Sequence, residues 1–155
     1  MGKFKKILST FVIMLIIIVT STLKVEAASG TITIKAKQTQ VVVGNTITYT
    51  VNVTSSDYMA ALQYDISYDK TMMTLTSGST SDAPVFSGNG VKTKTYTFKF
   101  KAKKTGTAKL TFNAVGATMS TPSKEIKFSS KTSSVKIITQ AQLEASYSKN
   151  NNLSS

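Results

Sequence analysis

The sequence contains no cysteine, no histidine and no tryptophan, and each of its 19 basic residues is a lysine. Without histidine and cysteine, the chain lacks the commonest general base, the thiol nucleophile and the usual ligands of zinc and copper. Without disulfides, a hydrophobic core must hold the fold together. These absences exclude most enzyme mechanisms and leave binding and structural roles as the main functional classes.

The first 27 residues have the pattern of a secretory signal peptide. Three lysines precede an unbroken apolar run over residues 11–19, and Val25 and Ala27 are the small residues that a signal peptidase reads. We predict cleavage after Ala27, with cleavage after Ala28 as the alternative. An uncleaved membrane anchor over residues 7–23 is the competing interpretation, although several Ser and Thr side chains in it argue against spanning. The pattern therefore predicts a secreted or cell-surface protein that meets the membrane only through this segment during export.

The chain is strongly basic. Its net charge is +12, and removal of the signal segment, with four lysines and one glutamate, would leave +9. An exported protein with this charge first meets anionic cell-wall polymer or lipid headgroups. Arginine, the bidentate reader of phosphate and guanine, is absent, so we predict no nucleic-acid partner. A solvated lysine-rich face is the simplest interpretation of the charge.

Most of the remaining sequence alternates apolar and polar residues, which is typical of half-buried β-strands. In residues 61–68, for example, Leu62, Tyr64, Ile66 and Tyr68 share one face and are expected to be core residues. The predicted strands cover residues 31–36, 41–43, 46–53, 61–68, 72–76, 94–102, 108–114, 125–129 and 133–138. Turn-forming residues separate these nine segments, so we predict an all-β, antiparallel two-sheet sandwich over residues 28–138.

The connections between strands give further expectations. Ser55, Ser56 and Asp57 predict a loop, and residues 77–90 predict a long loop with at most one short strand. The segments 94–102 and 108–114 flank a glycine turn, and we expect them to pair as a hairpin.

The alternation ends at Thr139. Thr139 and Gln142 have the spacing of a capping box and are followed by good helix formers. We predict a short helix to about Tyr147 and assign residues 139–155 as a helix and linker that leads into a further β-sandwich domain if the chain continues.

Several motifs, in a fixed order, resemble the cohesin domain of bacterial scaffold proteins. They are the segment VVVGNTI at 41–47, Tyr68-Asp69 followed by Leu75, and FKFKA at 98–102 before Gly106. The resemblance covers roughly Gly30 to Ile138. It implies a nine-stranded jelly-roll sandwich, an extracellular role in polysaccharide-degrading or surface assemblies, and a sheet face that grips a dockerin module. The tail 150–155 resembles the opening of a cadherin-like β-sandwich repeat.

The carboxylates are too few and too scattered to predict catalysis. A glycosidase needs two of them facing one cleft, and Asp65 and Asp69 do not form such a pair, so we predict no catalytic residue and no enzyme activity. Calcium needs six or more oxygen ligands. We therefore expect no cofactor and no metal, with a Ca²⁺ site in a loop at Asp57 or Asp82 as the alternative.

Two sets of residues are candidates for binding. Gln63, Asp65 and Ser67 lie on the polar face of their strand and predict a surface for a dockerin-like protein module. Tyr58 precedes that strand and is expected to be exposed, where its ring would stack on a sugar and make the domain a carbohydrate-binding module that binds polysaccharide. A purely structural spacer would use neither set.

Overall fold

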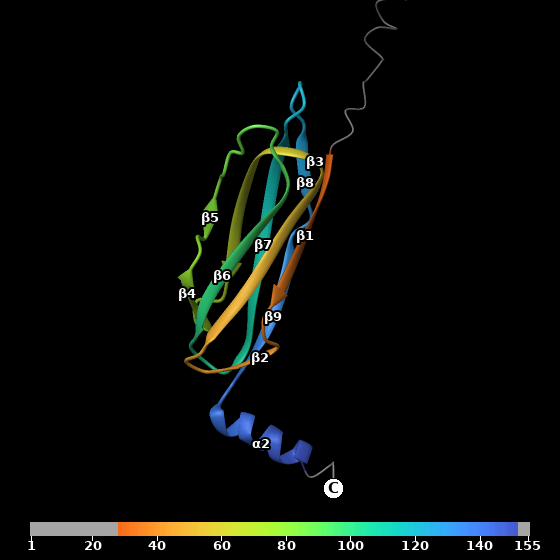
Figure 1. The fold of residues 1–155 in the computed structure, drawn as a ribbon. Coiled ribbons are helices and arrows are strands. Elements are labelled where there is room, and N and C mark those ends of the chain that lie inside the picture. The colour runs from red at the N-terminus through yellow and green to blue at the C-terminus, as the bar shows by residue number, and fades with distance from the viewer. Residues whose placement is uncertain (1–27, 152–155) are drawn as a thin grey trace, which may run out of the picture.

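The computed structural model describes residues 28–151 (Figure 1). The predicted signal segment 1–27 and the tail residues 152–155 lie outside the described residues. The elements are β1 (Ala28–Ala36), β2 (Gln40–Val42), β3 (Thr46–Tyr68), β4 (Met73–Ser77), β5 (Ser81–Asp82), β6 (Val91–Ala102), β7 (Gly106–Thr118), β8 (Glu125–Phe128), β9 (Lys131–Ile138) and α2 (Gln140–Asn151). The predicted all-β sandwich is confirmed, but it is not wholly antiparallel, because β1 pairs with β8 and β2 with β9 in parallel.

The strands form two facing layers that share one long strand, β3 (Figure 1). Residues 46–54 of β3 pair with β6, residues 49–55 pair with β1, and β4 extends this first sheet beyond β6. Residues 59–68 of β3 pair with β7, and β9 and β2 extend this second sheet. β8 joins the two layers because it pairs with both β1 and β7.

The predicted loop at residues 55–57 is wrong, because β3 runs through it without ending. The pairing register shifts between Thr54 and Met59, and the strand passes from one sheet to the other at this irregularity. Ser55 is buried there, and its hydroxyl accepts a hydrogen bond of 3.2 Å from the backbone N–H of Asp57. The polar side chain of Ser55, which suggested a loop, thus provides a hydrogen-bond partner for the backbone where hydrogen bonds between strands are lost.

The predicted hairpin of residues 94–102 and 108–114 is also wrong. β6 pairs with β3 and β4, whereas β7 pairs with β3, β8 and β9, so the two strands lie in different sheets. Their apolar faces meet across the core, where the ring centroids of Phe98 and Phe112 are 6.1 Å apart. Alternation identified the inward face of each strand correctly but carried no information on the pairing partner.

Aromatic side chains fill the space between the sheets. The ring of Tyr64 is stacked on Phe112 at 5.0 Å and lies 4.6 Å from the ring of Tyr96. Leu62, Tyr64 and Ile66 are buried, which confirms their assignment to the core. Such contacts add to the free energy of apolar burial and hold the sheets at a fixed separation.

The helix α2 begins with the predicted capping box. The N–H of Gln142 donates to the hydroxyl of Thr139 at 3.1 Å, and the N–H of Thr139 donates to the side-chain oxygen of Gln142 at 2.9 Å. The helix continues to Asn151, beyond the predicted end at Tyr147. Ser146 and Ser148 donate to backbone carbonyls one turn back and so remain compatible with helix. Within residues 28–151, no helix has the length and apolar content needed to cross a membrane.

Candidate protein-binding face

The outer face of the second sheet carries the three residues predicted to bind a protein. β3 and β7 pair in register from Ala61 opposite Ala117 to Tyr68 opposite Leu110. The outward pairs in this register are Gln63 with Val115, Asp65 with Asn113, and Ser67 with Thr111. Gln63, Asp65 and Ser67 are all exposed, so the structure places them on one accessible surface, while their binding role stays a prediction.

A shallow hollow lies at the centre of this face. It has a volume of about 250 Å³ and is lined by Gln63, Asp65, Asn113, Ala114 and Val115. The side-chain amide of Asn113 donates a hydrogen bond of 2.9 Å to the carboxylate of Asp65. Because this bond crosses between two paired strands, it holds both polar groups in place on a rigid surface.

Exposed apolar side chains lie in the wall of the hollow and on the loop beside β3. Val115 is 41% exposed, and Val85, which bridges to Ala61, is 81% exposed. Exposed aliphatic side chains beside amide and carboxylate groups are the combination found in protein interfaces, where an apolar centre is surrounded by polar contacts. The sequence analysis did not assign Asn113, Val115 or Val85 to this site, since only the register of β3 with its neighbours brings them together.

The strand at the edge of this face, β5, is short. β5 pairs with β3 only at Tyr64 and Asp65, and the flanking loop continues the border through backbone hydrogen bonds from Leu62 to Pro84 and from Ile66 to Thr80. The prediction of a long loop with one short strand at residues 77–90 is therefore confirmed. Because this edge strand is short, β3 and β7 make up the main part of the accessible surface.

Tyr58 lies where β3 crosses between the sheets and is 52% exposed. The ammonium nitrogen of Lys92 is 5.0 Å from the centroid of its ring, a cation–π contact that occupies one ring face. Met119 lies beside it, since the N–H of Met119 donates to the carbonyl of Tyr58 at 2.9 Å. The predicted exposure of Tyr58 is confirmed, and its role in binding a glycan stays a prediction.

Asp82, one of the two residues suggested for calcium, and Asp69 use their carboxylates in local hydrogen bonds. The carboxylate of Asp82 accepts a bond of 2.8 Å from the N–H of Ala83. Asp69, in the turn after β3, accepts bonds from the hydroxyl and the N–H of Thr71, and these bonds hold the pKa of Asp69 below its usual value. No group of three or more acidic, histidine or cysteine side chains within residues 28–151 could hold a metal ion.

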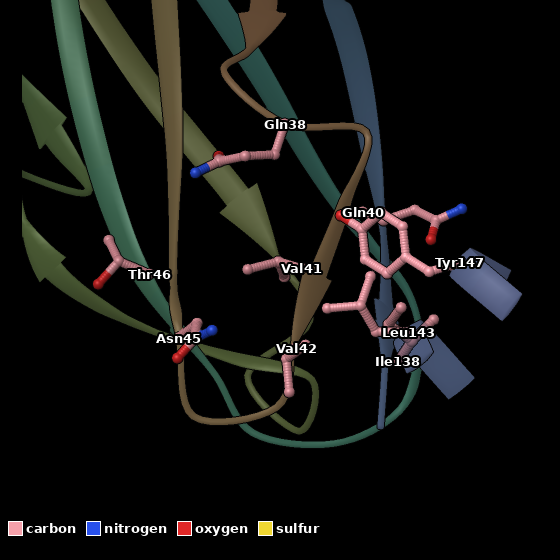
Figure 2. A pocket seen from close by; sticks show the side chains of 9 residues that line it. All are labelled: Gln38, Gln40, Val41, Val42, Asn45, Thr46, Ile138, Leu143 and Tyr147. Atoms are coloured by element: carbon pink, nitrogen blue, oxygen red, sulfur yellow. The ribbon is translucent and has the colours of Figure 1, made fainter. Parts of the chain in front are cut away.

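A second hollow of about 300 Å³ lies between α2 and the end of the sandwich (Figure 2). Leu143 and Tyr147, one helical turn apart, line it together with Ile138, Val41 and Val42. Gln38, Gln40, Asn45 and Thr46 add polar groups to its wall. Leu143 is only partly buried and Tyr147 is 62% exposed, so these two side chains dock the helix loosely against the strands.

The family model described as "Cohesin domain" matches residues 30–151. A search of curated proteins finds no match. Among solved structures, a native alpha-2-macroglobulin from Escherichia coli is similar at 13% identity with a TM-score of 0.56, over 73% of this chain and 17% of that chain. The CARDB domain of a Pyrococcus furiosus protein matches at 13% identity and a TM-score of 0.50, over 74% of this chain and 97% of that one.

A non-cellulosomal cohesin from the archaeon Archaeoglobus fulgidus is also similar, at 13% identity and a TM-score of 0.49, over 74% of this chain and 96% of that chain. At these identities the likenesses to the alpha-2-macroglobulin and the CARDB domain show the fold alone. The family model, in contrast, covers most of the chain and includes both halves of the candidate face.

Proposed function

Because the chain belongs to the cohesin family, we propose that it is an extracellular attachment module that binds a dockerin-like protein through the outer face of β3 and β7. Cohesin domains are non-catalytic modules that bind partner proteins, and they are typically extracellular or surface modules. The observation that carries the proposal is the rigid hollow at Gln63, Asp65 and Asn113, which the exposed Val115 also lines.

The physical properties of this face suit a protein partner. Its residues come from paired strands, so little conformational entropy is lost when a partner binds. A stable complex buries about 800 Å² on each partner, an area that requires most of the outer face of β3, β7 and β9. The hollow would take one protruding side chain, and Asp65 would accept a hydrogen bond or pair with a basic group.

The predicted signal peptide supports export of this module. We propose that it acts as a scaffold component on or outside a bacterial cell, in an assembly that degrades polysaccharide or attaches proteins to the surface. In that role it needs no cofactor, and its contribution is to hold another protein in place.

The test is binding to a panel of purified dockerin modules by surface plasmon resonance. The variant carrying Gln63→Arg and Val115→Arg places two bulky charges on the hollow and is expected to weaken binding at least 100-fold. The matched control carries Thr50→Arg and Thr97→Arg, which makes the same change of charge on the outer face of the other sheet. Equal losses in both variants, or no binding of any dockerin to the unmodified chain, would overturn the proposal.

Glycan binding through Tyr58 is the second candidate function, favoured by the exposed ring. Retention of the chain on an insoluble polysaccharide that is lost in Tyr58→Ala would support it. Lys92→Ala uncovers the second ring face and is then expected to preserve or increase retention. Retention that is unchanged in Tyr58→Ala would contradict this function.

A further inference from the structure

The outer face of the first sheet carries hydroxyl and ammonium groups. Taken together, β1, residues 46–54 of β3, and β6 carry threonine at most of their outward positions. The cross-strand rows are Thr31, Thr54 and Thr93; Thr33, Asn52 and Thr95; Lys35, Thr50 and Thr97; Thr48 and Lys99; and Thr46, Lys101 and Thr74. The inward neighbours of these residues form the core, so each outward side chain faces solvent or its neighbours in the same sheet.

Four lysines gather at one end of this surface. Lys99 and Lys101 are successive outward residues of β6, about 7 Å apart in a regular strand. Lys35 lies two strands away, opposite Thr50, and the N–H of Lys37 continues the same ladder by donating to the carbonyl of Thr48 at 2.8 Å. All four lysines are exposed, so their ammonium groups reach solvent from one side of the sheet.

The carboxylates of residues 28–151 lie elsewhere. Asp65 and Asp82 belong to the second sheet, Glu125 to β8 and Glu144 to α2. The remaining two, Asp57 and Asp69, lie where β3 crosses between the sheets and in the turn after it. The lysine end of the first sheet therefore has no acid among its outward strand residues, and Asp69, in the adjoining turn before β4, is the carboxylate that interacts with Lys104.

The chemistry of this face selects among possible partners. Tyr96, Phe98 and Phe100 of β6 all point inward, so the face offers no aromatic platform for stacking bases. It also lacks exposed aliphatic side chains, which the core of a protein interface requires. Closely spaced ammonium groups beside an array of hydroxyls suit a flexible polymer that alternates negative charges with hydroxyl-bearing units. Lysine binds phosphate as a point charge, without the oriented bidentate contact that arginine makes to carboxylate and phosphate alike.

We propose that the outer face of the first sheet binds a linear polymer of phosphodiester-linked polyol units. The lysines contact the phosphates, and the threonine hydroxyls bond to the polyol hydroxyls. Because this face and the proposed protein-binding face lie on opposite layers of the sandwich (Figure 1), both ligands can be bound at the same time. The module would then attach a partner protein to an anionic polymer.

The binding has a characteristic dependence on salt. A single exposed ion pair contributes little, so the affinity depends on several lysines acting together on one polymer. Neutralising several phosphates releases their counterions, and the affinity falls as the salt concentration rises. The slope of this fall reports the number of lysines engaged.

The experiment measures binding of the full chain to poly(glycerol phosphate) by isothermal titration over a range of salt concentrations. The quadruple variant K35Q, K37Q, K99Q and K101Q is expected to bind at least 30-fold more weakly, with a shallower salt dependence. The matched control, K109Q, K127Q, K131Q and K136Q, removes the same charge from exposed lysines of β7, β8 and β9 and is expected to change the affinity less than threefold. Thermal unfolding of both variants establishes that each is folded.

Further probes decide the identity of the ligand. Thr50→Val with Thr97→Val keeps every charge and is expected to weaken binding about threefold by removing hydroxyl contacts. Equal losses in the two quadruple variants would show attraction by net charge alone and would overturn the proposal. Absence of binding to the unmodified chain, or equal affinity for polygalacturonate or duplex DNA, would do the same.

Discussion

Asn113 donates a hydrogen bond of 2.9 Å to Asp65 across the paired strands β3 and β7, at the centre of the hollow on the second sheet. The two side chains are in register and on the outer surface, so the bond contributes little to the core. Its main effect is to fix the position of a negative charge where a partner would dock.

Asp65→Ala is therefore expected to separate stability from binding. The free energy of unfolding should fall by no more than about 1 kcal/mol, because an exposed hydrogen bond has a small net value. Affinity for a dockerin module that binds the unmodified chain should fall at least tenfold. Urea unfolding and surface plasmon resonance measure the two effects, and Glu144→Ala, which removes an exposed carboxylate from α2, should change neither. A loss of stability well above 2 kcal/mol would contradict a surface role.

Tyr49 makes the stability sensitive to alkaline pH. Burial raises its pKa from 10.0 to about 12. Between these values the unfolded chain releases the proton while the folded chain retains it, so this contribution to stability is complete below pH 10 and is lost as the pH rises towards 12. Tyr49→Phe removes the titrating group, so its free energy of unfolding should decline less steeply over this range. Urea unfolding between pH 8 and 11.5 measures both curves, and parallel curves would contradict the assignment.

The same substitution tests a buried hydroxyl. The Tyr49 oxygen has no hydrogen-bond partner among the described residues. Removing an unpaired buried polar atom is neutral or favourable, so Tyr49→Phe is expected to match the unmodified chain at pH 7 or exceed its stability by up to about 1 kcal/mol. A clear loss of stability at pH 7 would indicate that the hydroxyl is bonded after all.

Phe112→Ala should be among the most destabilising substitutions in the sandwich. Phe112 is fully buried and contacts aromatic rings of both sheets, including Tyr64 and Phe98. Truncation leaves a cavity and is expected to cost about 3–5 kcal/mol in urea unfolding. Val115→Ala, three residues further along β7 and exposed, should cost less than about 0.5 kcal/mol. Similar costs for the two variants would contradict the observed arrangement of the core.

Substitutions at two glycines near the start of β6 are expected to distinguish the cost of a steric clash from the cost of backbone strain. Gly88 and Gly90 both have positive φ, of 67° and 71°. A Cβ atom on Gly90 would lie 2.4 Å from the carbonyl oxygen of Met59, whereas one on Gly88 would meet nothing within 4 Å. Gly88→Ala should thus cost about 1 kcal/mol from strain alone, and Gly90→Ala appreciably more. Denaturant unfolding of the two variants measures the difference between their free energies of unfolding. Equal costs would contradict the clash, because they would mean that the backbone of β3 at Met59 moves aside without cost.

The sequence pattern predicted local structure well because burial acts on alternate residues of each strand. The inward positions of β3, including Tyr49 and Tyr64, follow directly from the alternation, and the capping box at Thr139 follows from side-chain chemistry within one turn. These features depend on neighbours close in the sequence. The same information assigned Gln63, Asp65 and Ser67 to the polar face of their strand.

The remaining features depend on contacts between distant segments. Ser55 looks like a loop residue, and only the passage of β3 between two sheets explains why it is buried in a continuous strand. Likewise, β6 and β7 are adjacent in sequence but meet through Phe98 and Phe112 across the core. The position of Asn113 beside Asp65 is set by the register of β3 with β7, which no single-strand pattern contains.

The arrangement of the terminal strands has a mechanical consequence. Ala28 begins β1 at one end of the sandwich and Ile138 ends β9 at the other (Figure 1), and β2, which follows β1, runs parallel to β9. A force that pulls these two points apart acts along the strands, so the hydrogen bonds that hold the terminal strands are sheared together rather than opened one after another. The domain should therefore resist extension along this axis until many bonds fail at once.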